Sequence, residues 1–266
     1  MKRVVSILLA LAMLIAVMLP VLADSVYSTS YSEQFVMGYS WSTGKTTGVS
    51  HSFRVFFKNP AQRSITSYRL SMRFYDADGT LINTDESEWV NKTVASNHGT
   101  WTAFVYAPDE ATTFTWKLAY HLNNSEKEYS SDWLTVAAPD NDSDLVSRRA
   151  WANAKKISVT ANSTDPVVNA TSFQEKYIFN INSKNGKLTG KNRYFRTYFK
   201  NIGDTPILGY EVELNCTVPD TKVPETVTTG HQAVTLGYGK GMWSSWIEMP
   251  MSTQTRDMSI TYDYVE

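Results

Sequence analysis

The residues with the clearest chemical potential are cations that alternate with aromatic residues along two predicted strands. On the sides expected to point outward, these strands carry Arg54, Phe56, Lys58, Arg69, Arg73 and Tyr75. Alternate side chains of a strand point to the same side, so these residues form one basic surface if the two strands share a sheet. Such a surface attracts an anionic partner: an acidic envelope polymer, a protein, or the acidic face of another copy's second unit. The alternative is a solvated sheet face whose cations pack on rings and bind no ligand.

Two further aromatic residues, Phe104 and Trp246, are expected on the exposed sides of short strands. An exposed ring can stack on a sugar, so a carbohydrate-binding module is the second function considered. Trp101 and Trp243 fall on the apolar sides of the same strands and are expected in the core. The predicted ligand-binding set is Arg54, Phe56, Lys58, Arg69, Arg73, Tyr75, Phe104 and Trp246.

Hydrolysis is the third function considered, and the chain offers few residues for it. A hydrolase needs a nucleophile with a base, or two facing carboxylates, and neither Gly-x-Ser-x-Gly nor His-Glu-x-x-His occurs. Glu33 and Glu175 occupy matching positions of the repeat described below, and each is interpreted as a solvated strand residue. We expect a protein without catalytic residues, and a small extracellular hydrolase is the remaining alternative.

No metal and no cofactor is expected. Gly44-Lys45-Thr46 resembles the end of a phosphate-binding loop, but the preceding Gly38 lies one residue too far upstream. Asp76 and Asp78 are explained by a hairpin turn, and the acidic stretch 140–144 lacks the glycine of a calcium loop. The four histidines have no spacing typical of a zinc site.

The elements that must position these residues occur twice. The stretch Phe53–Asn59 reads Phe-Arg-Val-Phe-Phe-Lys-Asn, and Phe195–Asn201 reads Phe-Arg-Thr-Tyr-Phe-Lys-Asn. The offset is 195 − 53 = 142 residues, and the same offset aligns Ile65, Gly99 and Trp101 with identical residues further along. This regularity predicts a tandem duplication.

In the second copy, the outward positions that match the basic surface carry Arg196, Tyr198, Lys200, Glu211, Glu213 and Asn215. Glu211 and Glu213 would lie beside the cations if the strands share a sheet. The second surface is therefore expected to neutralise itself through cross-strand ion pairs, whereas the first stays basic.

Short alternating strands separated by turn residues predict an all-β chain: two tandem antiparallel immunoglobulin-like β-sandwiches with a short connector. The expected divisions are a signal peptide at 1–23, the first repeat at 24–138, a connector at 139–170 and the second repeat at 171–266. The connector is expected to hold a short helix from Leu145 to Lys156, capped by Ser143 or Asp144. A strand at Ile157–Val159 is also considered.

The first residues have the pattern of a secretion signal. Lys2 and Arg3 precede an apolar run over 4–19, and Ala23 suits cleavage by a signal peptidase. The alternative is an uncleaved anchor, although the run is shorter than the ~20 residues that span a bilayer. We expect a secreted protein, of bacterial origin, whose retention at a cell surface would be non-covalent.

Net charge and cysteine content argue against a nucleic-acid-binding protein and against a disulfide-stabilised one. Without the signal the chain has 25 − 2 = 23 basic and 26 acidic residues, a net charge near −3, which does not favour nucleic-acid binding. Cys216 is the single cysteine, so no intrachain disulfide forms. Cys216 matches Phe74 of the first copy and is expected to be a buried, inert thiol.

The stretch Arg73–Ile82 carries Phe74-Tyr75-Asp76, a turn with Gly79, and an apolar strand that begins at Leu81. In this it resembles the FxLYD-type immunoglobulin-like modules of bacterial secreted and surface proteins. The resemblance covers the middle of the first copy and fades in the second, where Asn215–Pro219 replaces the triplet and turn. It implies a non-catalytic extracellular module and names no ligand.

Overall fold

The computed structural model describes residues 26–154, 167–219 and 223–264. The expected signal peptide with its cleavage after Ala23, and the strand considered at Ile157–Val159, lie outside these residues. Within them the regular structure consists of antiparallel strands together with the helix α2 (Ser143–Ala154), so the all-β prediction is confirmed. The likeness to immunoglobulin domains stays a prediction.

The centre of the molecule is one sheet to which both parts of the chain contribute. Its four long strands are β1 (Tyr27–Ser40), β2 (Thr46–Lys58), β10 (Val168–Asn182) and β11 (Leu188–Asn201). Four short strands extend it: β5 (Gly99–Trp101), β6 (Val105–Ala107), β15 (Gly241–Trp243) and β16 (Ile247–Met249). We call it the shared sheet, and we call residues 26–138 the first half and 167–264 the second half.

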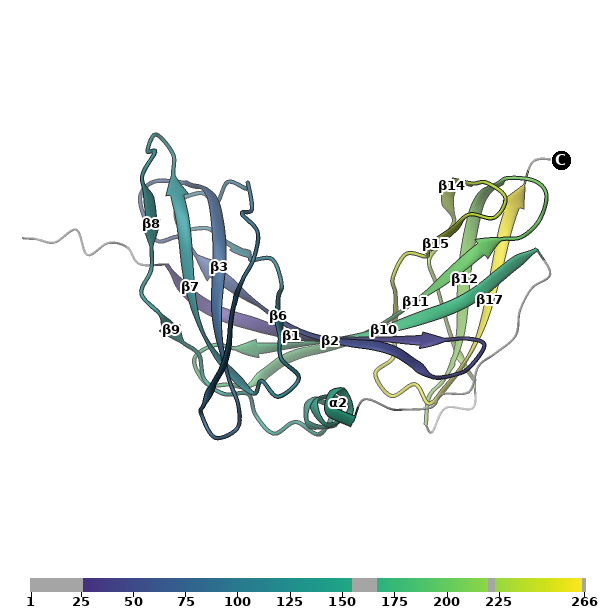
Figure 1. Cartoon of the computed structure of the whole chain (residues 1–266), viewed down its shortest axis with the longest axis horizontal. Helices are drawn as coiled ribbons and strands as arrows, with labels where there is room; N and C mark the ends of the chain where they lie inside the picture. The colour runs from purple at the N-terminus through teal and green to yellow at the C-terminus, as the bar shows by residue number, and fades with distance from the viewer. Residues whose placement is uncertain (1–25, 155–166, 220–222, 265–266) are drawn as a thin grey trace, which may run out of the picture.

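Two outer sheets stand at opposite ends of the long strands (Figure 1). The first half forms β3 (Ile65–Tyr75), β4 (Leu81–Glu86), β7 (Thr113–Leu122), β8 (Glu128–Ser130) and β9 (Leu134–Thr135). The second half forms β12 (Ile207–Thr217), β13 (Glu225–Thr228), β14 (Gln232–Leu236) and β17 (Thr255–Tyr264). Each outer sheet therefore closes a core against one end of the shared sheet.

The halves meet through the antiparallel pairing of β1 with β10. In this register Phe35 faces Tyr177, and these two residues are 177 − 35 = 142 positions apart, which is the offset of the repeated motif. Corresponding strands of the two halves therefore pair about a local two-fold axis that passes beside Phe35 and Tyr177. The halves are not separate sandwiches in series, because one sheet runs through both.

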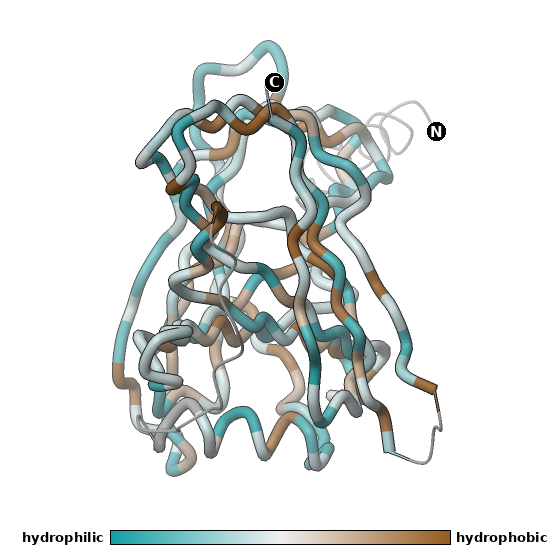
Figure 2. Tube along the Cα trace, turned by 90° about the vertical axis from the view of Figure 1, so that its right-hand side faces the viewer, coloured by the Kyte–Doolittle hydropathy of each residue, from teal (hydrophilic) through white to brown (hydrophobic). Residues whose placement is uncertain are grey.

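The repeated seven-residue motif supplies the core of each half. Phe53, Val55 and Phe57 are buried, as are Phe195 and Phe199, because alternate residues of β2 and β11 point toward the outer sheets. Figure 2 shows hydrophilic and hydrophobic residues interspersed along the strands. Because successive side chains of a strand point to opposite faces, the intervening residues of the motif, including Arg54 and Arg196, lie on the other face of the shared sheet.

The asparagine that ends each motif fixes the loop that follows. Asn59 Nδ2 donates hydrogen bonds to the carbonyl oxygens of Arg63 and Val94. Asn201 Nδ2 does the same with the carbonyls of Thr205 and Leu236. Both amides are buried, so each satisfies backbone groups that would otherwise be unpaired inside the protein.

The hairpin predicted at Asp76 joins β3 to β4. The Asp76 carboxylate accepts hydrogen bonds from the backbone N–H groups of Asp78 and Thr80. Gly79 has a φ of 79°, a conformation that glycine adopts without steric cost. The Asp76 carboxylate therefore stabilises the turn, as the sequence predicted.

Helix α2 lies below the middle of the shared sheet in Figure 1. It begins at Ser143, and its cap is Asp142, whose carboxylate accepts hydrogen bonds from the N–H groups of Asp144 and Leu145. The helix expected in the connector is thus present, but the capping residue precedes both predicted caps. Buried Leu145 anchors it to the core.

Candidate binding site

The predicted basic surface is divided between two sheets. Arg54, Phe56 and Lys58 lie on β2 of the shared sheet, whereas Arg69, Arg73 and Tyr75 lie on β3 of an outer sheet. The condition for one continuous surface, that both strands share a sheet, is not met. The two groups must therefore be considered separately.

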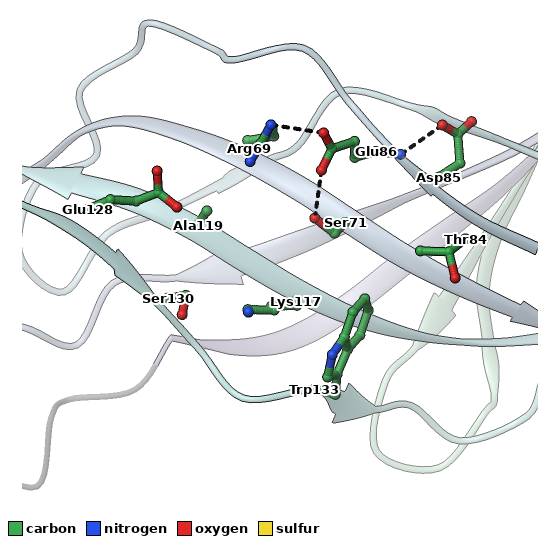
Figure 3. A pocket seen from close by; sticks show the side chains of 10 residues that line it. All are labelled: Arg69, Ser71, Thr84, Asp85, Glu86, Lys117, Ala119, Glu128, Ser130 and Trp133. Atoms are coloured by element: carbon green, nitrogen blue, oxygen red, sulfur yellow. Dashed lines mark hydrogen bonds and ion pairs between the residues drawn. The ribbon is translucent and has the colours of Figure 1, made fainter.

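The group on β3 borders a hollow of about 440 Å³ on the first half's outer sheet (Figure 3). Its charged lining residues are Arg69, Asp85, Glu86, Lys117 and Glu128. Arg69 Nη1 forms an ion pair with Glu86 Oε1 at 2.8 Å, and Ser71 Oγ donates to Glu86 Oε2. Three carboxylates thus balance two cations, and this hollow does not have the basic character expected from β3 alone.

The other two β3 residues, Arg73 and Tyr75, contact neighbouring side chains of the first half. The Arg73 guanidinium lies 4.1 Å from the centre of the Trp133 ring. The Tyr75 hydroxyl is 3.4 Å from Thr115 Oγ1. Neither residue contributes to the hollow shown in Figure 3.

On the shared sheet, Arg54 is held between two aromatic rings. Its guanidinium carbon lies 4.5 Å from the ring centre of Trp101 and 4.6 Å from that of Phe104. Phe56 packs edge-on against Trp101, while Lys58 lies opposite Gly99 at the end of the strand pair. Burial lowers the pKa of Arg54, so its surroundings favour a group that compensates its charge.

The second half repeats this stack with Arg196. Its guanidinium carbon lies 4.6 Å from the Trp243 ring and 4.4 Å from the Trp246 ring. Its Nε and Nη2 atoms donate to Gln174 Oε1 at 2.9 and 2.6 Å. We refer to these two arrangements as the arginine stacks.

The arginine stacks overturn two expectations. Trp101 and Trp243 are partly exposed and pack on the arginines, because they lie on the same face of the shared sheet as Arg54 and Arg196. The expected neutralisation of Arg196 by Glu211 does not occur, because β11 and β12 belong to different sheets. The second half therefore adds positive charge to the shared sheet.

A hollow of about 350 Å³ lies between the two stacks, on the shared-sheet face turned away from α2. The first half lines it with Gln34, Val36, Ser50, Ser52, Phe104 and Tyr106. The second half lines it with Gln174, Lys176, Arg196 and Trp246. We call this the shared-sheet hollow. It brings together Phe104 and Trp246, which the sequence predicted as exposed rings and which are 142 residues apart.

The lining of the shared-sheet hollow contains two cations and no carboxylate. Lys176 Nζ lies 4.2 Å from the Trp246 ring centre and 4.8 Å from that of Tyr194. Burial lowers the pKa of Lys176, and the nearby charges of Arg196 and Arg54 lower it further. Three cations, one from the first half and two from the second, thus repel one another around a hollow whose lining includes no carboxylate.

A second depression of about 250 Å³ continues the hollow along the sheet. The two share Val36, Ser50 and Gln174, and the depression also includes Gly38 and Gly48. The space above Gly48 is open, since a Cβ at this position would meet no heavy atom within 4 Å. Together the two form a trough that follows β1 and β2, because Ser52, Ser50 and Gly48 are successive positions on one side of β2.

Sequence reasoning missed Gln34, Gln174, Lys176 and Tyr106. One signal pointed to part of this set. Gln34 and Lys176 are related by the 142-residue offset, as are the predicted residues Phe104 and Trp246. The pairing of β1 with β10, which no pattern within one copy specifies, is what places them on one surface.

Glu33 and Glu175, expected in solvent, are buried beneath the opposite face. Glu33 accepts hydrogen bonds from Arg149 at 2.8 and 2.6 Å and lies 2.9 Å from His51 Nε2. Burial acts to raise the pKa of Glu33, but the hydrogen bond from His51 and the charge of Arg149 outweigh it, and the pKa is lowered.

Glu175 has different partners. It pairs with Arg193 and Arg256 at 2.9 and 2.6 Å and accepts a hydrogen bond from the Tyr177 hydroxyl. Burial again acts to raise its pKa, and the charges of Arg256 and Arg193 lower it overall. Each carboxylate is therefore a buried counter-ion, and neither faces the shared-sheet hollow.

Neither a comparison with models of protein families nor a search among curated proteins finds a match for this chain. In the described ranges no helix has the length and apolar character that a membrane crossing requires. The same ranges contain no group of three or more His, Cys, Asp or Glu residues positioned to hold a metal ion.

Proposed function

We propose that this chain is a non-catalytic extracellular binding protein, built from a duplicated β-sandwich, whose shared-sheet hollow binds an anionic polymer. The observation that carries the proposal is the composition of the hollow: Lys176 and Arg196 line it, Arg54 lies nearby, and its lining has no carboxylate. The extracellular location rests on the signal pattern at residues 1–23.

The energetics favour an anion over an empty surface. Cations that are partly removed from water and lie near one another lose solvation, and a bound negative group restores it while lowering their mutual repulsion. The aromatic stacks hold the two arginines in fixed positions, so little conformational entropy is lost when a ligand binds them. Gln34, Ser52 and Gln174 supply further polar groups beside the cations.

The geometry gives less support to the alternatives. Glu33 and Glu175 are each neutralised by arginines in direct contact, so they do not form the facing carboxylate pair of a glycosidase. The chain's slight negative net charge disfavours a nucleic-acid partner. No cofactor enters the proposal.

Co-sedimentation of the mature protein with isolated cell envelopes tests the proposal. We expect binding at low salt that is lost near 0.5 M salt, where exposed charge contacts are strongly screened. Lys176→Glu should abolish binding, because it places a negative charge in the hollow. Arg69→Glu is the matched control, since Arg69 lies on the outer sheet and its reversal should leave binding unchanged.

Three outcomes would overturn the proposal. Binding unaffected by Lys176→Glu would move the site elsewhere, and loss of binding after protease treatment of the envelopes would indicate a protein partner. Absence of binding at low salt would indicate that the stacks are structural. Circular dichroism of the Lys176→Glu variant must match the wild type, so that misfolding is not read as lost binding.

A further inference from the structure

The trough formed by the shared-sheet hollow and its continuation has the form of a site for an extended chain. It follows β1 and β2 from Gln34 and Ser52 to Gly38 and Gly48, and the two depressions have volumes of about 350 and 250 Å³. A small anion would fill only one end. A linear polymer would contact the whole length.

The lining mixes three kinds of group. Gln34, Ser50, Ser52 and Gln174 are neutral hydrogen-bonding side chains, while Lys176 and Arg196 are cationic. The third kind is aromatic, and Tyr106 is 68% exposed at the edge of the hollow. The rings of Trp246 and Phe104 are already in contact with cations, so Tyr106 is the ring most available for stacking.

Each kind of group matches a part of an acidic sugar. Amide and hydroxyl side chains bind sugar hydroxyls, an exposed tyrosine ring packs against the apolar face of a pyranose, and cations bind a carboxylate or sulfate. A polyphosphate or an acidic peptide would use the cations but would leave the neutral groups and the tyrosine with less to bind. We infer that the ligand of the trough is an acidic polysaccharide, an inference that rests on the proposed binding of an anionic polymer.

The test measures the affinity of the whole mature protein for defined polymers by isothermal titration calorimetry. The probes are polygalacturonate and dextran sulfate as acidic glycans, dextran as a neutral glycan, and poly-L-glutamate as a polyanion without sugar. We expect one of the acidic glycans to bind at least tenfold more tightly than both dextran and poly-L-glutamate at the same salt concentration.

Two variants locate the site. Gly48→Phe fills the trough without a clash at the backbone, because the space at its Cβ is open, and should weaken acidic-glycan binding at least tenfold. Gly190→Phe is the matched control: Gly190 is the equivalent residue of β11, its Cβ position is not crowded, and it does not line the trough. Tyr106→Ala should weaken binding of the acidic glycan more than binding of poly-L-glutamate.

The outcomes separate this inference from the proposed function. Equal affinity for poly-L-glutamate and the acidic glycans, unchanged by Tyr106→Ala, would overturn the polysaccharide inference and leave anionic-polymer binding standing. Binding of dextran as tight as that of dextran sulfate would overturn both, since charge would then be irrelevant. Equal effects of Gly48→Phe and Gly190→Phe would remove the ligand from the trough.

Discussion

Arg149 of α2 forms a two-point ion pair with Glu33 of β1. Its Nε lies 2.8 Å from Oε1 and its Nη2 lies 2.6 Å from Oε2, the geometry in which a guanidinium binds a carboxylate most strongly. Arg149 also donates to the carbonyl oxygen of Thr112, just before β7. One side chain of the connector thus joins the helix to the shared sheet and to the first half's outer sheet.

Replacing this carboxylate should be costly. Glu33→Ala leaves Arg149 and His51 without their buried anion, and breaking a buried ion pair in this way costs about 3–5 kcal/mol. Urea denaturation would measure the change in the free energy of unfolding. Glu86→Ala removes the exposed ion pair with Arg69 and should cost at most about 1 kcal/mol. Equal losses for the two variants would contradict the buried role of Glu33.

The free energy of unfolding should decrease at acidic pH. The pKa values of Glu33 and Glu175 in the folded protein are below the ordinary value of 4.5, so the unfolded chain binds protons first as pH decreases. The stabilisation from the charged carboxylates is complete above pH 4.5 and is lost as pH falls through the lowered pKa values. Denaturation midpoints between pH 7 and pH 3 would show this, and the Glu33→Gln, Glu175→Gln variant should have a flatter dependence over the acid range. A dependence as steep as that of the wild type would assign the effect to other groups.

The two halves should unfold together. Trp41, which follows β1, is buried in the second half, where its ring centre lies 4.4 Å from that of Phe173 and its Nε1 donates to Thr197 Oγ1 at 3.1 Å. Trp41→Ala should cost about 3–5 kcal/mol, the range for truncating a buried aromatic residue. Thr197→Val, which removes the hydroxyl that accepts from Trp41 and donates to the Ser172 carbonyl oxygen, should cost about 1–3 kcal/mol.

Circular dichroism and tryptophan fluorescence should report one coincident unfolding transition for the wild type and for both variants. Trp133→Ala, at a partly exposed ring on the outer sheet, should cost clearly less than Trp41→Ala. Two separate transitions in the wild type would mean that the shared sheet does not couple the halves.

The thiol of Cys216 should be unreactive in the native protein. The residue is fully buried on β12, and burial raises the pKa of its thiol, so little thiolate is present or accessible. Labelling with a chromogenic disulfide reagent should be slow in buffer and rapid in denaturant. Fast labelling without denaturant would place Cys216 at a surface or in a segment that opens readily.

The strands and their buried sides were predictable because the signal is local. Alternation along Phe53, Val55 and Phe57 identifies a half-buried strand, and the Asp76 turn identifies a hairpin. The burial of Cys216 followed from its match to Phe74 in the other copy. Each of these inferences needs only a few neighbouring residues.

Assignment of strands to sheets was not predictable in the same way. The pattern of Arg54 on β2 and Arg69 on β3 gives the side of each strand, yet it does not state whether the strands are neighbours. Period-two alternation likewise cannot distinguish an exposed acid from a paired buried one, so Glu33 was misplaced. Its true partner Arg149 is 116 residues away, beyond the range of any local pattern.

The candidate site was half predictable for the same reason. Arg54, Phe104 and Trp246 were identified by residue type, whereas Lys176 entered only through the pairing of β1 with β10. The lengths of these strands, 14 and 15 residues, hold the physical clue. A typical strand has about 5–6 residues, and the excess lets each strand reach from its own core into that of the other half.

The axis beside Phe35 and Tyr177 gives this single chain an internal interface like that of an isologous homodimer. In a true homodimer one gene encodes both sides, and every substitution appears twice. Here the two sides are separate stretches of one chain, so each can change alone. His51 and Arg193 occupy equivalent positions with different side chains, and the hollow has a tyrosine, Tyr106, where the other half has Glu248. A symmetric backbone can thus carry an asymmetric set of side chains. Such a surface would distinguish the two directions of a bound linear polymer.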